Sequence, residues 1–80
     1  MEPLAASLLL KRVDLGRNMN RFYHLSVEPT LFGGFAVCRT WGRLGATGRT
    51  RLDLFADVSS ALAHLEKLAV QKHKRGYRPD

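Results

Sequence analysis

Four strand-like segments, separated by short turns, occupy residues 7–55 of this 80-residue chain. In the second segment, Tyr23, Leu25 and Val27 alternate with other side chains at the period of two that is typical of a strand. Glycine, asparagine and proline residues lie between the segments, where they favour turns. Strands this closely spaced predict an antiparallel meander. The predicted strands are Ser7–Asp14, Arg21–Glu28, Phe35–Arg43 and Arg49–Phe55.

A helix is predicted after the fourth strand, because apolar residues recur from Val58 onward at the spacing of a sheet-packed helix. Asp57 is a favourable N-cap, Gly76 suits the residue after the last turn, and Pro79 prevents continuation. One helix buries one face of a sheet. The sequence therefore predicts one α+β domain over residues 1–80: a small antiparallel β-sheet of about four strands with one C-terminal helix packed on one face. The predicted inner face of the helix consists of Val58, Ala61, Leu62, Leu65, Leu68, Ala69 and Lys72, and the solvent face of His64, Lys67, Gln71 and Lys74.

Positive charge is concentrated in the middle of the chain. Thirteen Lys and Arg residues against seven Asp and Glu residues give a net charge of +6. Six arginines lie between positions 17 and 51, where Glu28 is the single acidic residue. This local excess of arginine favours polyanions as partners. Positive charge that serves solubility alone is the other interpretation.

Cysteine content and apolar runs indicate the compartment. Cys38 is the only cysteine of the sequence, which excludes an internal disulfide and favours a reducing cytoplasm. The apolar run Leu4–Leu10 is too short to span a bilayer, and its flanking charges have the wrong order for a signal peptide. We therefore expect a cytoplasmic protein with no membrane partner.

The segment Arg39-Thr40-Trp41-Gly42-Arg43 holds the most specific binding signal. Alternate side chains of a strand share a face, so Arg39, Trp41 and Arg43 line one surface. Trp41 is the sole tryptophan. A large ring between two cations suits a flat anionic ligand, because the indole stacks and the guanidinium groups bind phosphate. We expect this stripe on the sheet face that the helix leaves open, or at its edge; a core position under the helix is the alternative for Trp41.

The neighbouring strand carries more arginine. Arg49 and Arg51 share a face with Asp53, and they either extend the basic patch or form a solvated face. An ion pair with Asp53 is the alternative to anion contact for Arg43.

A turn and the helix end supply the remaining candidates. Asn20 and Arg21 lie at a turn, where phosphate contact and a structural role for Asn20 are both open. Tyr77 is interpreted as a packing residue. The cations interpreted as helix-end charges are Lys72, Lys74 and Arg75. The predicted nucleic-acid contacts are Trp41, Arg43, Arg39, Arg49, Arg51, Asn20 and Arg21.

Catalytic and metal-binding patterns are not found in the sequence. The glycine-rich stretch 42–48 lacks the Gly-Lys-Ser/Thr ending of a phosphate loop, and the cysteine and histidines lack zinc-site spacing. A nucleophile pair of Cys38 and His24 is not supported, because Cys38 alternates with Trp41 and is expected to point toward the helix. We expect no enzyme activity, no cofactor and no metal.

Four blocks of this sequence resemble the WGR domain family, which is named for its Trp-Gly-Arg tripeptide. They occur in the family's order and span about residues 7–78. The resemblance implies a sheet with a helix packed on it, and DNA binding. The blocks are Asn20-Arg21-Phe22-Tyr23, Leu31-Phe32-Gly33-Gly34-Phe35, Trp41-Gly42-Arg43-Leu44-Gly45 with Gly48-Arg49-Thr50, and Lys72 with Gly76-Tyr77.

The resemblance also implies a mode of binding. In poly(ADP-ribose) polymerases the module lies near strand breaks, where the Trp stacks on a sugar, the Arg works beside it, and binding is relayed to a catalytic domain. In bacteria the module occurs alone or joined to other domains. Trp41 and Arg43 are thus the implied contacts. No catalytic domain follows Asp80 in this sequence, so we expect a non-catalytic monomer, associated with the nucleoid if bacterial.

Two functions follow from these patterns. The first is a module that binds nucleic acid, with DNA, including nicked or ended duplex, as the implied partner. The alternative is a protein-interaction module that docks an acidic partner or a catalytic domain supplied in trans.

Overall fold

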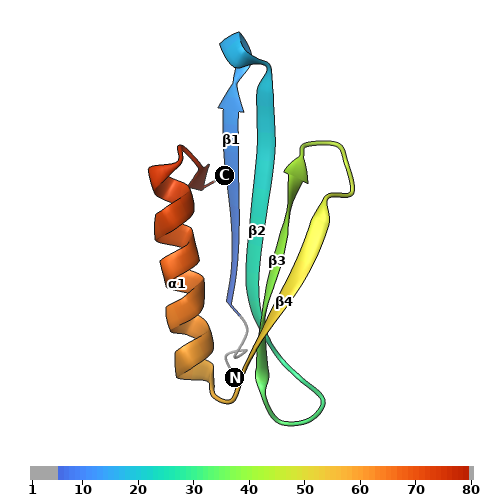
Figure 1. Ribbon diagram of the computed structural model, residues 1–80, viewed down its shortest axis with the longest axis vertical. Coiled ribbons are helices and arrows are strands. Elements are labelled where there is room, and N and C mark those ends of the chain that lie inside the picture. Colours follow the sequence, from blue (N-terminus) through green and yellow to red (C-terminus); the bar gives the residue numbers. More distant parts are fainter. Residues whose placement is uncertain (1–5, 80) are drawn as a thin grey trace.

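An antiparallel sheet of five strands carries one α-helix in the computed structural model, which describes residues 6–79 (Figure 1). The strands lie in the order β4-β3-β2-β1-β5, and every neighbouring pair is antiparallel. The predicted α+β class is confirmed. The elements are β1 (Ala6–Asp14), the short 3-10 helix η1 (Leu15–Arg17), β2 (Met19–Pro29), β3 (Phe35–Arg43), β4 (Arg49–Phe55), α1 (Val58–Lys74) and β5 (Arg78–Pro79).

The predicted element boundaries differ little from the observed ones. β3 and β4 have the predicted bounds, β1 begins one residue earlier, and β2 is extended at both ends. The fifth strand was not predicted: Arg78 and Pro79 pair with Lys11 and Leu10 at the edge of β1. Two residues carry no periodicity, so this strand has no sequence signal. Leu4 and Ala5 of the apolar run lie outside the described residues.

Local interactions define the ends of α1. The Asp57 carboxylate accepts a hydrogen bond of 2.8 Å from the Ser60 backbone N–H, as an N-cap does. Gly76 follows the helix with φ +97°, a left-handed conformation that glycine adopts without strain. Within residues 6–79, no helix has the length and apolar character needed to cross a membrane.

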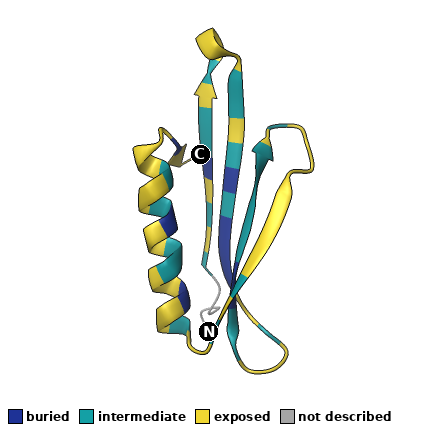
Figure 2. Ribbon diagram, viewed as in Figure 1, coloured by how far each residue is buried: buried dark blue, intermediate teal, exposed yellow. Residues whose placement is uncertain are grey.

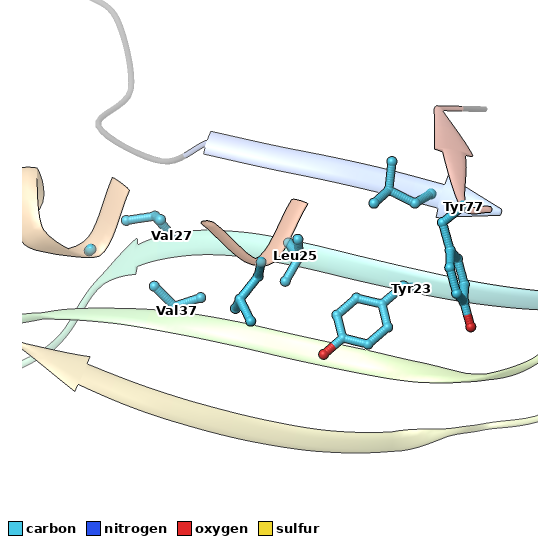
Figure 3. Packing of buried hydrophobic residues seen from close by; sticks show 8 residues of the cluster. Tyr23, Leu25, Val27, Val37 and Tyr77 are labelled. Carbon is cyan, nitrogen blue, oxygen red and sulfur yellow. The ribbon is translucent and has the colours of Figure 1, made fainter. Parts of the chain in front are cut away.

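The core lies between α1 and the odd-numbered side chains of β2 and β3 (Figures 2 and 3). Leu25, Val27 and Val37 are completely buried there. Val27 and Val37 are direct partners across the two strands, and Ala61 and Leu68 belong to the same cluster from the helix side.

This register corrects one prediction. The side chain of Cys38 belongs to the opposite face, where its register partner on β2 is Ser26. The expectation that Cys38 points toward the helix is wrong, because its neighbour Val37 occupies the core.

The helix covers only part of its sheet face. α1 has 17 residues, or roughly 26 Å at the helical rise, whereas β2 has 11 residues, or roughly 37 Å. The β1–β2 hairpin therefore extends past the C-terminal end of α1 (Figure 1). Part of the helix-side face is thus not covered by α1.

Candidate nucleic-acid interface

A pocket of about 410 Å³ opens on the helix side of the sheet, at the C-terminal end of α1. Its walls come from β2, β3, β4, the end of the helix and the segment that follows it. Three aromatic rings and five cations line the pocket: Tyr23, Trp41 and Tyr77, with Arg21, Arg39, Arg51, Lys72 and Arg75. Among the described residues no acidic side chain lines it, so the pocket suits an anion that also has a flat part.

Aromatic rings form the base of this pocket. Tyr23 and Trp41 are register partners on β2 and β3, and their rings stack with centroids 5.8 Å apart and planes 15° apart. The Tyr77 ring meets Tyr23 edge-on at 6.1 Å, and Figure 3 shows these two tyrosines at the pocket end of the core. Lys72 Nζ lies 4.4 Å from the centroid of the Tyr23 ring.

The position of Trp41 differs from both sequence interpretations. It lies on the helix side of the sheet, not on the face opposite the helix. It is partly buried against the core, yet it still lines the pocket. The short reach of α1 explains this outcome, because the same face that forms the core becomes accessible where the helix ends.

A row of three arginines crosses the sheet next to the pocket. Arg12 on β1 pairs with Arg21 on β2, and Arg21 pairs with Arg43 on β3. Like charges directly opposite one another destabilise a sheet, so an anion that lies over this row would relieve the repulsion. Arg43 is held in place by hydrogen bonds from its Nη atoms to Asn18 O at 3.4 Å and to Asn18 Oδ1 at 3.3 Å. Sequence reasoning missed Arg12, since its relation to the site appears only in the strand register.

Asp53 organises the β4 side of the pocket. Its carboxylate lies 3.1 Å from Arg39 Nε, 3.1 Å from Arg51 Nε and 3.2 Å from His64 Nε2. Burial alone would raise the pKa of Asp53, but the hydrogen bond with His64 and the charges of both arginines outweigh it and lower that pKa. Asp53 therefore fixes two pocket cations and stays charged.

These contacts revise two expectations. The suggested Arg43–Asp53 pair is not formed, because the register places Asp53 opposite Val37, far along β3 from Arg43, and the carboxylate contacts Arg39 and Arg51 there. The helical spacing predicts His64 on the solvent face of the helix, but in the structure it is partly buried at Asp53. Arg39 Nε is buried and, among the described residues, has an ion pair but no hydrogen bond of good geometry.

The end of α1 contributes two pocket cations that the sequence suggested were simple helix-end charges. Lys72 and Arg75 both line the pocket. Burial, followed by the charges of Arg75 and Arg39, lowers the pKa of Lys72. A bound anion would favour the protonated amine and reverse this shift.

The other two predicted site residues lie outside the pocket. Arg49 is exposed on β4 opposite Trp41, on the same face and beside the pocket. Asn20 precedes Arg21, so its side chain belongs to the other face of the sheet. Its backbone carbonyl accepts a hydrogen bond of 2.9 Å from Leu44 N–H. The structure thus brings four of the predicted contacts together in the pocket: Arg21, Arg39, Trp41 and Arg51. Arg43 and Arg49 lie adjacent to the pocket. Asn20 is separated from the others.

Metal chemistry has no candidate centre in the described part of the chain. No three side chains of His, Cys, Asp or Glu gather there in a way that would hold an ion. The arrangement offers positive charge and stacking surface.

Comparison with known proteins identifies the family. The WGR domain profile matches residues 6–80. Uncharacterized protein y4dW of Sinorhizobium fredii is 43% identical over 72 residues, which cover 90% of this chain and 35% of that protein. A poly(ADP-ribose) polymerase of Sarcophaga peregrina is 34% identical over 68 residues, which cover 82% of this chain and 7% of that protein. The chain thus spans about a third of one relative and a small part of the other. With its profile matched over nearly the whole length, the chain belongs to the WGR domain family.

Proposed function

We propose that this WGR domain binds DNA through its sugar–phosphate backbone, and that the pocket at the end of α1 is the centre of the interface. The observation that carries the proposal is the convergence of five cations on a stacked Tyr23–Trp41 pair, in a lining to which the described part of the chain contributes no acidic side chain. The family relationship supports the same ligand, since one relative is a poly(ADP-ribose) polymerase.

The pocket residues divide into two roles. Arg21, Lys72 and Arg75 supply positive charge to phosphate groups, and Arg12 and Arg43, which flank Arg21 in the row, extend this charge along the backbone. Trp41 supplies an aromatic surface for a sugar or base. Tyr23 stacks against the indole from the neighbouring strand, so the ring needs little reordering on binding. Backbone contacts of this kind position a protein without reading base sequence.

A strand break is the form of DNA that fits this site best. Trp41 is partly buried at the base of a pocket, whereas the sugars of an intact duplex are held within a continuous backbone. A nick or an end releases a terminal sugar and phosphate that can enter. We therefore expect tighter binding to nicked or blunt-ended duplex than to a closed circular duplex.

A salt series with three DNA forms tests the proposal. Closed circular, nicked circular and short blunt duplexes are titrated while the fluorescence of Trp41, the sole tryptophan, is followed. We expect quenching on binding and an affinity that falls steeply with salt, with a logarithmic slope of about −0.9 for each phosphate contacted. An affinity independent of salt would overturn the proposal.

The Trp41→Ala variant tests the stacking role. Anisotropy of a labelled duplex replaces tryptophan fluorescence as the readout, and we expect a loss of about 1–3 kcal/mol of binding free energy. Phe32→Ala is the matched control, because it removes an aromatic ring that is 97% exposed and distant from the pocket. Equal affinity of Trp41→Ala and the parent would exclude stacking.

An acidic protein partner is the second candidate. The observation that favours it is that both relatives are longer than the matched region, so the domain adjoins other protein segments in them. Under this alternative a pull-down recovers one acidic partner, and none of the three DNA forms is retained.

A further inference from the structure

We propose that the free edge of β4 is a self-association surface, on which a second copy of this chain pairs its own β4 in an antiparallel, two-fold arrangement. The proposal does not rest on nucleic-acid binding, since its evidence is the free edge of β4 and the exposed side chains of that strand on the face away from the helix. Of the residues that it pairs, Arg51 also lines the cationic pocket.

An exposed apolar cluster lies at the end of the sheet opposite the cationic pocket. Leu31 is 96% exposed, Phe32 97%, Leu54 73% and Leu52 58%. The first three line an apolar groove of about 430 Å³ together with Phe35 and Phe55, and this groove shares no residue with the cationic pocket. Contiguous apolar surface of this kind marks an interaction site.

The strand next to this cluster has one unpaired edge. β4 is the terminal strand of the sheet and pairs only with β3 among the described strands. It is seven residues long and mostly exposed in Figure 2, it contains no proline or lysine, and its charged residues Arg49, Arg51 and Asp53 all lie on the helix side of the strand. An edge with free backbone donors and acceptors binds another strand.

The sequence of β4 is self-complementary about Leu52. In an antiparallel pair centred there, Leu52 lies opposite the partner's Leu52, and Thr50 opposite the partner's Leu54, all on the face away from the helix. Arg51 lies opposite the partner's Asp53 on the helix side, so unlike charges oppose one another across the interface, next to the Arg51–Asp53 ion pair within each chain.

Neighbouring registers are less favourable. Centring the pair on Arg51 would oppose two arginines, and centring it on Asp53 would oppose two carboxylates. A shift by one residue would place Leu52 opposite a charged residue of the other face. The self-complementarity of this one register is the reason that we infer a second copy as the occupant, in contrast to the monomer expected from the sequence.

The cationic pockets do not oppose this arrangement. Each chain carries a net charge of +6, but repulsion between exposed charges is largely screened beyond about 8 Å at physiological salt. Both helices lie on the same side of the continuous sheet. Arg51 is the pocket cation at the new interface, where it lies beside the partner's Asp53, whereas the lining from β2 and α1 lies on the side of β4 away from the partner.

Disulfide trapping tests the register. The natural Cys38 is first changed by Cys38→Ser, because Cys38 is the register partner of Leu52 within one chain and would capture a new cysteine there. In that background, Leu52→Cys is expected to form a covalent dimer under mild oxidation. Thr50→Cys alone and Leu54→Cys alone are expected to stay monomeric, whereas a mixture of these two forms a covalent dimer.

The pattern of covalent dimers decides whether β4 pairs in the proposed register. The proposal would be overturned if the Leu52→Cys variant stayed monomeric. It would also be overturned if Thr50→Cys alone and Leu54→Cys alone each formed a covalent dimer as readily as Leu52→Cys does. Light scattering of the unmodified chain provides the second measurement. We expect a dimer mass at high protein concentration, and a dimer dissociation constant at least tenfold higher for Leu52→Lys.

The control for that measurement is Leu62→Lys, which adds the same charge at a 40% exposed leucine on α1 and should leave the constant unchanged. Monomer mass at every concentration, or an equal effect of both lysine variants, would contradict the proposal. Circular dichroism confirms that both variants remain folded.

Discussion

The covered and uncovered ends of the helix-side face are built from the same two strands and differ in what lies above them. Under α1, β2 and β3 contribute Leu25, Val27 and Val37, which are completely buried. Beyond the helix, the same alternation places Tyr23 and Trp41 beside a row of arginines. One face therefore serves as core and as binding surface, and the length of the helix sets the boundary between them.

Stability and function are separated along the strands by this arrangement. At the covered end, side chains lose water contact against α1 and stabilise the fold. At the other end, like charges face one another across β1, β2 and β3, which opposes folding in the absence of a ligand. Substitutions at the covered end should thus lower stability and leave binding unchanged, whereas removal of a charge at the uncovered end should raise stability and weaken binding.

The largest effect is expected at the covered end. Leu25→Ala removes a side chain with no exposed surface, and such substitutions lower the free energy of unfolding by about 2–5 kcal/mol. Urea unfolding measures the change. Leu15→Ala is the control, because Leu15 is 86% exposed and its loss should alter the free energy by less than about 0.5 kcal/mol. DNA affinity of the folded Leu25→Ala protein should equal that of the parent; a large loss would mean that the two ends are not separable.

Asp53 lies between the two ends, and its substitution should have an intermediate effect on the free energy of unfolding. Asp53→Asn removes the charge that holds Arg39 and Arg51, which should lower the free energy of unfolding by about 1.5–3 kcal/mol at neutral pH. The pKa of Asp53 is lowered in the folded protein. Its contribution is therefore fully present above the ordinary Asp pKa of about 4 and is lost as pH falls through the folded-state value.

Unfolding of both proteins across a pH series measures this dependence. The difference between parent and Asp53→Asn should shrink as the pH falls below about 4. A difference that stays constant down to strongly acidic pH would show that the Asp53 charge does not carry the effect.

The sequence was sufficient to predict most elements but not the location of the site within them. Alternation at Tyr23, Leu25 and Val27 defined β2, and the apolar spacing from Val58 defined α1. Neither pattern states how far the helix reaches along the sheet. For that reason Trp41 was expected on the open face and Cys38 toward the helix, the reverse of what the register gives.

Residues distant in sequence enter the site only through the fold. Arg12 lies 9 positions before its register partner Arg21, and Lys72 approaches Tyr23 from the end of the helix. In the sequence, Arg12 is a charged residue on a strand and Lys72 is a charged residue at a helix end. Both patterns are common on protein surfaces and do not indicate a binding site. The aromatic and arginine residues of β3 were found because they are close in sequence and unusual in type.

The smallest expected change in stability is the one that most directly tests the division between the two ends. Arg21→Ala removes the central charge of the row that Arg12 and Arg43 flank, and relief of this repulsion should raise the free energy of unfolding by about 0.2–1 kcal/mol. The same substitution should weaken DNA binding and reduce the logarithmic salt slope by about one. Lys67→Ala removes an equal charge from the exposed side of α1 and should change neither quantity to this degree.

A surface evolved only for solubility would respond alike to both substitutions, because it has no ligand to offset the repulsion between its charges. An increase in stability together with a loss of binding, at Arg21 alone, would mean that the uncovered end is organised for an anion at the expense of the free protein's stability.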